Sequence, residues 1–243
     1  MSKSNPNIGL YVTCLIDISA PEIGFAAANL LEKAGCTVNV PAQTCCGQPA
    51  YNNGNRADAI EIAKSTISIF ERFDQLVVPS ASCAGMIRHH YPQLFEEGSS
   101  WNQRALELAP RTFELIDYLY TKRGMQTIEG ELSGRVAYHE SCSALREMKT
   151  KGARELLSSL NGIDLIDLAG NEECCGFGGL FSVKYSAISN AIADAKLRTI
   201  KQQNIDLLTG VDLGCLQNLG GKLRRSGLDI KVCHVAELLA NAA

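Results

Sequence analysis

The chain has 243 residues, of which 46% are hydrophobic and 20% are charged, a composition typical of a soluble globular protein rather than a disordered or fibrous one. Its formal net charge of −3 offers no broad basic surface, so nucleic acid and anionic lipid are excluded as expected partners. The length suits either one large α/β domain or two lobes of about 110–120 residues.

The N-terminal stretch Met1–Pro6 is polar and lacks the apolar segment of a secretory signal. No apolar run approaches the roughly 20 residues that an integral membrane segment needs. We therefore expect a cytoplasmic protein without a membrane span. In that compartment the ten cysteines are expected to be free thiols or metal ligands rather than structural disulfides.

Short apolar runs alternate with segments of helical spacing along the whole chain. In the first half the pattern predicts strands at Ile8–Thr13, Thr37–Val40 and Gln75–Val78 and helices at Pro21–Ala34, Arg56–Phe73 and Thr112–Lys122. In the second half it predicts strands at Arg135–Tyr138, Leu165–Leu168, Leu207–Thr209 and Ile230–Val232 and helices at Gly152–Leu160, Ser186–Gln203 and Val235–Ala240. Such alternation predicts an α/β fold of mostly parallel sheets flanked by helices.

The arrangement of the cysteines occurs twice. The spacing is C-x30-CC-x36-C in the first half and C-x31-CC-x39-C in the second, and it comprises Cys14, Cys45, Cys46 and Cys83, then Cys142, Cys174, Cys175 and Cys215. Thr112–Leu115 also resembles Val235–Leu238. We interpret this repetition as an internal duplication that gives two pseudo-symmetric lobes, residues 1–126 and 127–243.

Each repeated cysteine follows a predicted strand directly or after a short loop. Parallel strands point their C-terminal ends to one edge of a sheet, where open α/β sheets bind ligands. The four cysteines of each half are therefore expected to meet.

Four thiolates are the usual ligands of an iron–sulfur cluster, and soft sulfur ligands favour iron–sulfur or zinc over hard cations. Adjacent cysteines are poorly placed to chelate one small ion but can reach two corners of a larger cluster. The glycine after each pair would bring backbone N–H groups close to the sulfur atoms. The pattern thus favours a cluster at all eight cysteines. Zinc, a dithiol–disulfide switch and buried apolar thiols remain alternatives, and for Cys36 and Cys233, outside the repeat, we expect a core position.

The sequence resembles a known family, the cysteine-rich CCG-domain proteins. The resemblance rests on Cys45–Ala50, on Cys174–Gly179 continuing through Phe181–Lys184, on Cys215–Asn218, and on Val12–Cys14 and His234–Glu237. The family includes the B-type subunit of heterodisulfide reductase, the iron–sulfur subunit of glycolate oxidase and, most similar in these motifs, the lactate utilization protein A group.

The resemblance implies an iron–sulfur electron-transfer subunit, carrying [4Fe-4S] clusters, of a complex that oxidises L-lactate or a related 2-hydroxy acid, with L-lactate giving pyruvate. Its implied partners are a sister subunit with ferredoxin-type clusters, a third lactate utilization protein and L-lactate itself. In the heterodisulfide reductase relative the motif ends in CxxC, which gives five cysteines per site. Here Cys83 and Cys215 lack the second cysteine of that pair. A thiol–disulfide oxidoreductase of that kind and a zinc-stabilised, non-redox interaction module are the alternative functions.

A few other polar residues are candidate functional groups, and no catalytic residue is assigned. His139 is either a strand-end histidine or an additional ligand or hydrogen-bond donor to sulfur. Lys184 and Arg146 are either surface charges or groups that bind a carboxylate substrate. For His89, His90 and His234 we expect capping or surface roles.

Overall fold

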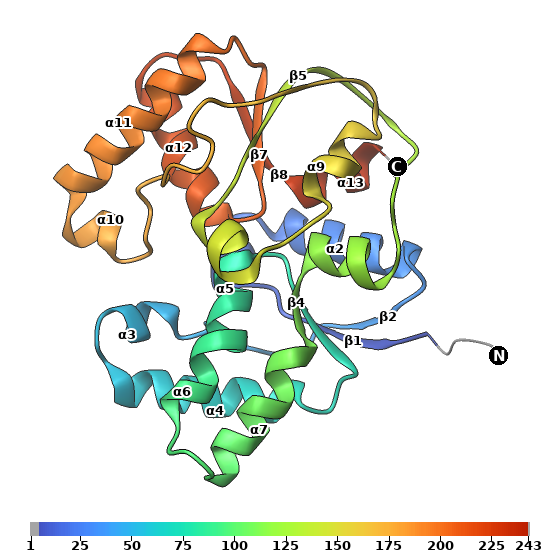
Figure 1. Ribbon diagram of the computed structural model, residues 1–243, viewed down its shortest axis with the longest axis vertical. Coiled ribbons are helices and arrows are strands. Elements are labelled where there is room, and N and C mark those ends of the chain that lie inside the picture. The colour runs from blue at the N-terminus through green and yellow to red at the C-terminus, as the bar shows by residue number, and fades with distance from the viewer. Residues whose placement is uncertain (1–4, 243) are drawn as a thin grey trace.

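Two parallel sheets of four strands form the framework of the molecule (Figure 1). The strand order is β2-β1-β3-β4 in the first half and β6-β5-β7-β8 in the second. The strands are β1 (Asn7–Leu10), β2 (Thr37–Asn39), β3 (Gln75–Val78), β4 (Thr112–Glu114), β5 (Glu131–His139), β6 (Asn161–Ile166), β7 (Leu207–Gly210) and β8 (Lys231–His234). The predicted two-lobed α/β fold is confirmed.

The structure is a computed structural model that describes residues 5–242. Residues 1–4 of the predicted polar N-terminal stretch, and residue 243, lie outside the described residues. The boundary between lobes at residue 126 stays a prediction.

The second sheet repeats the register of the first. Ile8 of β1 pairs with Gln75 of β3, and Val136 of β5 pairs with Leu207 of β7. Ile8 therefore corresponds to Val136, which keeps Cys14 in register with Cys142 and Cys83 with Cys215. The internal repeat predicted from the cysteines extends to the strand pairing.

Helices and helical turns make all the connections between the strands. Those of the first half are α1 (Cys14–Ser19), α2 (Pro21–Lys33), α3 (Gln48–Asn52), α4 (Arg56–Phe70), α5 (Ala81–Gly85), η1 (Met86–His90), α6 (Tyr91–Leu94), α7 (Ser100–Leu108), η2 (Ala109–Arg111), α8 (Leu115–Asp117) and η3 (Tyr118–Lys122). Those of the second half are η4 (Ser143–Met148), α9 (Ala153–Ser158), α10 (Phe181–Lys184), α11 (Ser186–Gln202), α12 (Leu213–Arg225) and α13 (Val235–Ala242). Within residues 5–242, none of these helices is both long and apolar enough to cross a membrane.

Hydroxyl side chains begin the helices that follow the central strands. The Thr13 hydroxyl accepts a hydrogen bond from the Ile16 amide at the start of α1, and the Ser80 hydroxyl accepts one from the Cys83 amide at the start of α5. These side chains satisfy amides that the helix itself leaves without a partner. The caps thus fix the first turns that carry Cys14 and Cys83.

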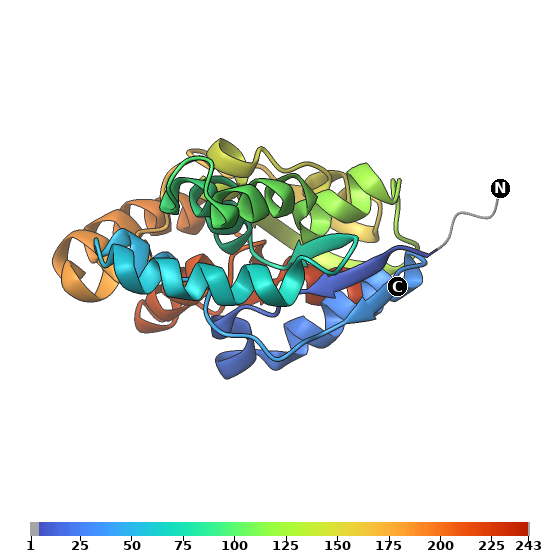
Figure 2. The same ribbon diagram turned by 90° about the horizontal axis from the view of Figure 1, so that it is seen from below.

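The hydrophobic core has three parts. One lies in the first half under α4 and α7, whose outer position Figure 2 shows, and another lies in the second half under α11 and α12. The largest part lies between the halves and is built from α2 and α8 of the first and α9 and α13 of the second. The halves therefore share a core rather than each burying only its own.

Several elements differ from the sequence-based expectation, and two of them bear on the site. Thr112–Glu114 is strand β4 rather than the start of a helix, because all three residues are buried and pair with β3. Cys215 lies in the first turn of α12, which the sequence did not predict. The observed ends of the other predicted elements differ from the predicted ends by up to four residues.

The pairing also corrects the alignment of the last strands. Both β4 and β8 end immediately before a helix, so Glu114 corresponds to His234, and Leu115 to Val235. The predicted alignment of Thr112–Leu115 with Val235–Leu238 was therefore out of register.

The carboxylate of Asp212 joins the two halves. It is 5% exposed and precedes α12. Its Oδ1 accepts hydrogen bonds from Ser80 Oγ at 2.7 Å and the Ser82 amide at 3.0 Å, and its Oδ2 accepts one from Ser141 Oγ. Hydrogen bonds to a buried charged acceptor are stronger than neutral ones. Asp212 thus holds the ends of β3, β5 and β7 together.

We predict that Asp212→Asn lowers the free energy of unfolding by roughly 1–3 kcal/mol, because the amide removes the charge and can turn a donor toward the Ser82 amide. Denaturant unfolding under anaerobic, reducing conditions measures the change. Asp229→Asn, at an exposed position, is the matched control and should stay within about 0.5 kcal/mol of the wild type. Equal effects of the two substitutions would show that Asp212 does not hold the junction.

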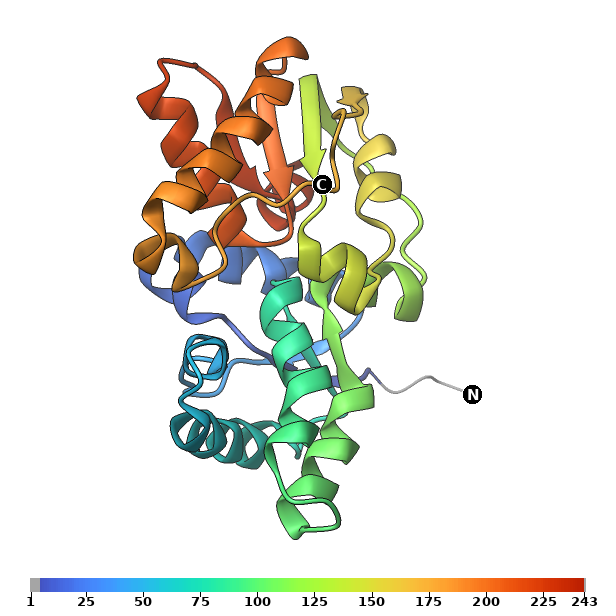
Figure 3. The same ribbon diagram turned by 60° about the vertical axis from the view of Figure 1, so that its left-hand side comes forward.

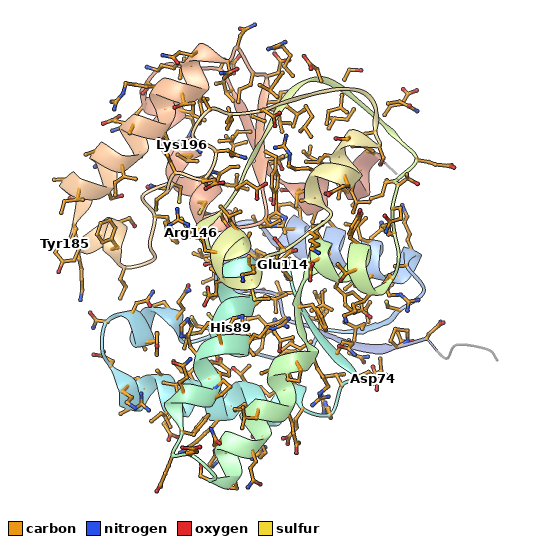
Figure 4. The ribbon with its side chains drawn as sticks, viewed as in Figure 1. Asp74, His89, Glu114, Arg146, Tyr185 and Lys196 are labelled. Carbon is orange, nitrogen blue, oxygen red and sulfur yellow. The ribbon has the colours of Figure 1, made fainter. Side chains whose placement is uncertain are left out.

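Glu114 is a second buried acid at this junction (Figure 4). Its Oε2 accepts a hydrogen bond from the Asp117 amide at 2.9 Å, and its Oε1 has no partner among the described residues. Burial, with smaller contributions from the charges of Asp117 and Asp212, raises the pKa of Glu114 from 4.5 to about 8. The side chain is therefore mostly protonated at neutral pH.

This raised pKa gives stability a defined pH dependence. Between pH 4.5 and about 8 the folded state holds the Glu114 proton more tightly than the unfolded state, so stability falls as pH rises through this range. Glu114→Gln has no carboxyl group to titrate at this position, so its stability lacks this pH dependence. Its free energy of unfolding relative to the wild type should therefore increase by at least about 1 kcal/mol between pH 5 and pH 8. Glu131→Gln, at an exposed position, should show a pH-independent difference, and the same result for Glu114→Gln would contradict the buried-acid interpretation.

Candidate metal centre

The four repeated cysteines of the first half, here called the first quartet, follow β1, β2 and β3. Cys14 is the first residue of α1, Cys45 and Cys46 directly precede the turn at Gly47, and Cys83 is the third residue of α5. The Cys46 and Cys83 sulfur atoms are 3.3 Å apart, and the Cys45 thiol interacts with those of Cys14 and Cys46. The four thiols form one continuous group, as the sequence predicts.

The second quartet repeats this arrangement at the ends of β5, β6 and β7. The Cys175 and Cys215 sulfur atoms are 2.8 Å apart, and the Cys174 thiol interacts with those of Cys142 and Cys175. Two amides point at sulfur: the Gly176 amide donates to Cys174 Sγ at 3.3 Å, and the Phe177 amide donates to Cys175 Sγ at 3.4 Å. These are the N–H groups that the CCG turn was expected to supply.

Glycine is required at the second turn. Gly176 has φ +84°, and a Cβ added there would lie 2.6 Å from the Ser189 carbonyl oxygen. Gly47 has the same backbone conformation in the first half, with φ +81°. A side chain at either position would strain the backbone that directs the cysteine pair inward.

All eight cysteines line one cavity of about 430 Å³ between the two halves. Thr13, Ser80, Ser141 and Asp212, which form the helix starts and the junction, line it too. Figure 3 shows how the second half sits over the first, with α10 above α3 at the side. The sequence predicted two groups of cysteines but not that they open into a shared space.

The thiols of each quartet are too close to ionise independently. Hydrogen bonds from Cys14 and Cys46 lower the pKa of Cys45, and those from Cys142 and Cys175 lower the pKa of Cys174. The same interactions, together with burial, raise the pKa values of Cys14, Cys46, Cys142 and Cys175. A metal cation would relieve this repulsion and release the protons. Four convergent soft donors in each half therefore fit a metal or iron–sulfur group.

His139 lies beside the second quartet, at the end of β5. Its ring is 1% exposed, and neither ring nitrogen has a hydrogen-bond partner among the described residues. One ring nitrogen and the sulfur atoms of Cys175 and Cys215 lie within 4.8 Å of one another. Burial, with a further contribution from the charge of Lys196, lowers the pKa of His139 to about 4, so the imidazole is neutral at pH 7.

Lys196 is a buried cation that the sequence analysis missed. Its Nζ donates to the carbonyl oxygens of Gly170 at 2.7 Å and Asn171 at 2.9 Å, in the loop that precedes the second CCG turn (Figure 4). Burial lowers its pKa, and the charge of Glu173, followed by the nearby cysteine sulfur atoms, acts in the opposite direction. The helical spacing Ser189, Ala193, Lys196, Ile200 along the buried face of α11 was the available signal.

Two tyrosines, also missed, hold the first CCG turn. Tyr11 Oη donates to the Thr44 carbonyl oxygen at 2.5 Å, and Tyr91 Oη donates to the Cys46 carbonyl oxygen at 2.8 Å. Both side chains are fully buried. In the second half the Cys175 carbonyl oxygen instead accepts from Asn218 Nδ2 at 2.8 Å. The two quartets are thus supported by different side chains.

The remaining charged candidates lie outside the cavity lining. Lys184 Nζ donates to Asn53 Oδ1 across the two halves, and Arg146 donates to the Glu172 carbonyl oxygen at 3.4 Å. His90 pairs with Glu147 at 2.7 Å, and His234 is buried with its Nε2 2.9 Å from the Val211 carbonyl oxygen. His234 ends β8, and its Nδ1 accepts a hydrogen bond from the Ala236 amide at 3.2 Å in the first turn of α13, so of the two expected roles the capping role is confirmed and the surface role is wrong.

Cys36 and Cys233 pack in or against the shared core, as predicted. Cys36 is 6% exposed, and its Sγ lies 4.0 Å from Tyr118 Oη. Neither residue lines the cavity of the quartets.

Comparison with known proteins agrees with the repeat. The family described as CCG, cysteine-rich domain, matches residues 8–88 and 136–220. Lactate utilization protein A 2 of Bacillus cereus (strain Q1) is 42% identical over 235 residues, covering 96% of this chain and 97% of that protein. Lactate utilization protein A of Geobacillus sp. (strain WCH70) is 44% identical over 234 residues, covering 96% and 98%.

Among solved structures, a hypothetical protein from Helicobacter pylori superimposes with a TM-score of 0.63 at 11% sequence identity. All of this chain is covered, but it spans about half (51%) of that longer chain. At this identity the likeness concerns the fold alone. Both CCG matches and nearly full-length identity above 40% point the same way: the chain belongs to the family of CCG cysteine-rich domain proteins that includes lactate utilization protein A.

Proposed function

We propose that the protein is an iron–sulfur electron-transfer subunit that acts in the oxidation of L-lactate to pyruvate. The observation that carries this proposal is the convergence of two cysteine quartets on one cavity. The lactate utilization names of the relatives supply the substrate. A bound cluster would accept and release one electron at a time.

The donor set favours a cluster over zinc. Each quartet contains two adjacent cysteines that line the same cavity as the two lone ones, an arrangement that suits a group larger than a single ion. The amides of Gly176 and Phe177 already donate to sulfur, and such hydrogen bonds tune cluster potentials. Four thiolates per half match the ligand number of a [4Fe-4S] cluster, which we propose for both quartets.

A partner protein is required to deliver or remove the electrons. The proposed partners are a sister subunit with ferredoxin-type clusters and a third lactate utilization protein. Large apolar side chains are exposed next to the cavity: Leu180, Val183, Tyr185 and Ile188, with exposed fractions between 36% and 76%. Leu180 also lines the cavity, so a protein bound to this rim would be close to the second quartet.

One observation favours a second candidate function, thiol–disulfide exchange. The Cys175 and Cys215 sulfur atoms are 2.8 Å apart and those of Cys46 and Cys83 are 3.3 Å apart, so each half holds a thiol pair close enough to be oxidised. Metal analysis separates this function from the leading one.

We predict that protein purified without oxygen contains iron and acid-labile sulfide, and that Cys174→Ser lowers iron per chain by about half because it removes one ligand of one quartet. The EPR signal of one centre should be lost and the other retained. Cys36→Ser changes a buried cysteine outside both quartets and should keep the iron content. Zinc without sulfide, or a metal-free protein with two dithiol pairs, would refute the cluster; equal loss of both signals would mean one shared site.

A host strain that lacks this protein should not grow on L-lactate as sole carbon source, because its oxidation would have no electron carrier. The wild-type gene and Cys36→Ser should restore growth, whereas Cys174→Ser should not. Growth rate on L-lactate, compared with growth on pyruvate, measures the effect. Normal growth of the deleted strain on L-lactate would refute the proposed pathway without bearing on cluster binding.

A further inference from the structure

His139 is an unpartnered polar group in the interior of the second half. Its side chain is 1% exposed, yet neither Nδ1 nor Nε2 has a hydrogen-bond partner in the described part of the chain. Leaving a buried polar atom without a partner costs about 1–3 kcal/mol. Such a group in a native protein calls for an explanation, and an ion that binds there is one.

The surroundings of His139 identify what that partner would be. One ring nitrogen lies within 4.8 Å of the sulfur atoms of Cys175 and Cys215, which are 2.8 Å from each other. Imidazole nitrogen and thiolate sulfur are both ligands of iron and zinc, and the three atoms are close enough to reach one metal ion with small side-chain adjustments.

We propose that His139 is a nitrogen ligand of the metal centre in the second half, beside Cys175 and Cys215. This inference rests on the proposed metal binding by the second quartet and adds a donor to it. The second half then offers one imidazole and four thiols, whereas the first offers four thiols alone.

In the first half a tyrosine occupies the position equivalent to His139. The matching strand registers make Tyr11 the counterpart of His139, and each lies three residues before the first cysteine of its quartet. Tyr11 Oη is already satisfied, because it donates to the Thr44 carbonyl oxygen at 2.5 Å. The duplicated fold therefore builds two centres that are not equivalent, one with a histidine ligand and one without.

The test is pulsed EPR of anaerobically prepared protein that carries ¹⁵N-labelled histidine, is loaded with iron and sulfide, and is then reduced. We expect a strongly coupled nitrogen in the wild type. His139→Ala and His139→Cys should lose it, and His139→Cys should keep its iron because a thiolate replaces the imidazole. His89→Ala, which changes a partly buried histidine away from the cavity lining, should retain the coupling. No strongly coupled nitrogen in the wild type, or its persistence in both His139 variants, would overturn the inference.

Failure of this inference and failure of the proposed function are distinguishable. Iron and sulfide in both halves without nitrogen coupling would refute the histidine ligand alone and leave the electron-transfer role standing. Protein that takes no iron and sulfide would refute that role, and the ligand is then tested with Co²⁺ added to the metal-free protein. Loss of His139 should shift the visible d–d bands toward those of an all-thiolate site, and unchanged bands would overturn the ligand assignment.

Discussion

The buried carboxylate of Asp212 is the contact on which the arrangement of the two halves depends. It accepts hydrogen bonds from Ser80, Ser82 and Ser141, so one charge binds residues that follow β3 and β5 to the start of α12. Ser80 and Asp212 occupy equivalent positions in the repeat, directly before the helices that carry Cys83 and Cys215. Equivalent positions in the two copies therefore carry the cysteines of each quartet and also supply the groups through which the two halves contact each other.

Crowded sulfur atoms are the second constraint. Each quartet has one cysteine whose pKa is lowered by its neighbours and others whose pKa values are raised, so the protein favours the thiolates of Cys45 and Cys174 over those of Cys46 and Cys175. Four thiolates would need a cation to offset their repulsion, which couples metal binding to proton release. The protein around the quartets differs: the second has His139 and the buried Lys196, and the first has two tyrosines.

The sequence was sufficient to predict the fold class and the grouping of the cysteines, because the alternation of strands with helices and the repeated cysteine spacing are both visible in the order of the residues. It failed at β4, where Thr112, Phe113 and Glu114 are all buried and show no alternation, and at α12, where Gly220 and Gly221 weaken the helical signal. It also could not reveal the shared core, since α2 and α13 come from opposite ends of the chain. Long-range packing of this kind leaves no trace in local periodicity.

The single cavity changes what a duplicated cysteine motif implies. Two separate lobes would hold two independent centres, each approached from its own side. Here both quartets open into one space of about 430 Å³, and the rim at α10 belongs to the second half only. Under the proposed function, oxidation of a 2-hydroxy acid to a 2-oxo acid would release two electrons, and clusters held by the two quartets would be adjacent enough to take one each. The exposed apolar rim at α10 and the buried His139 both belong to the second half, so the two quartets have different surroundings although they open into the same cavity.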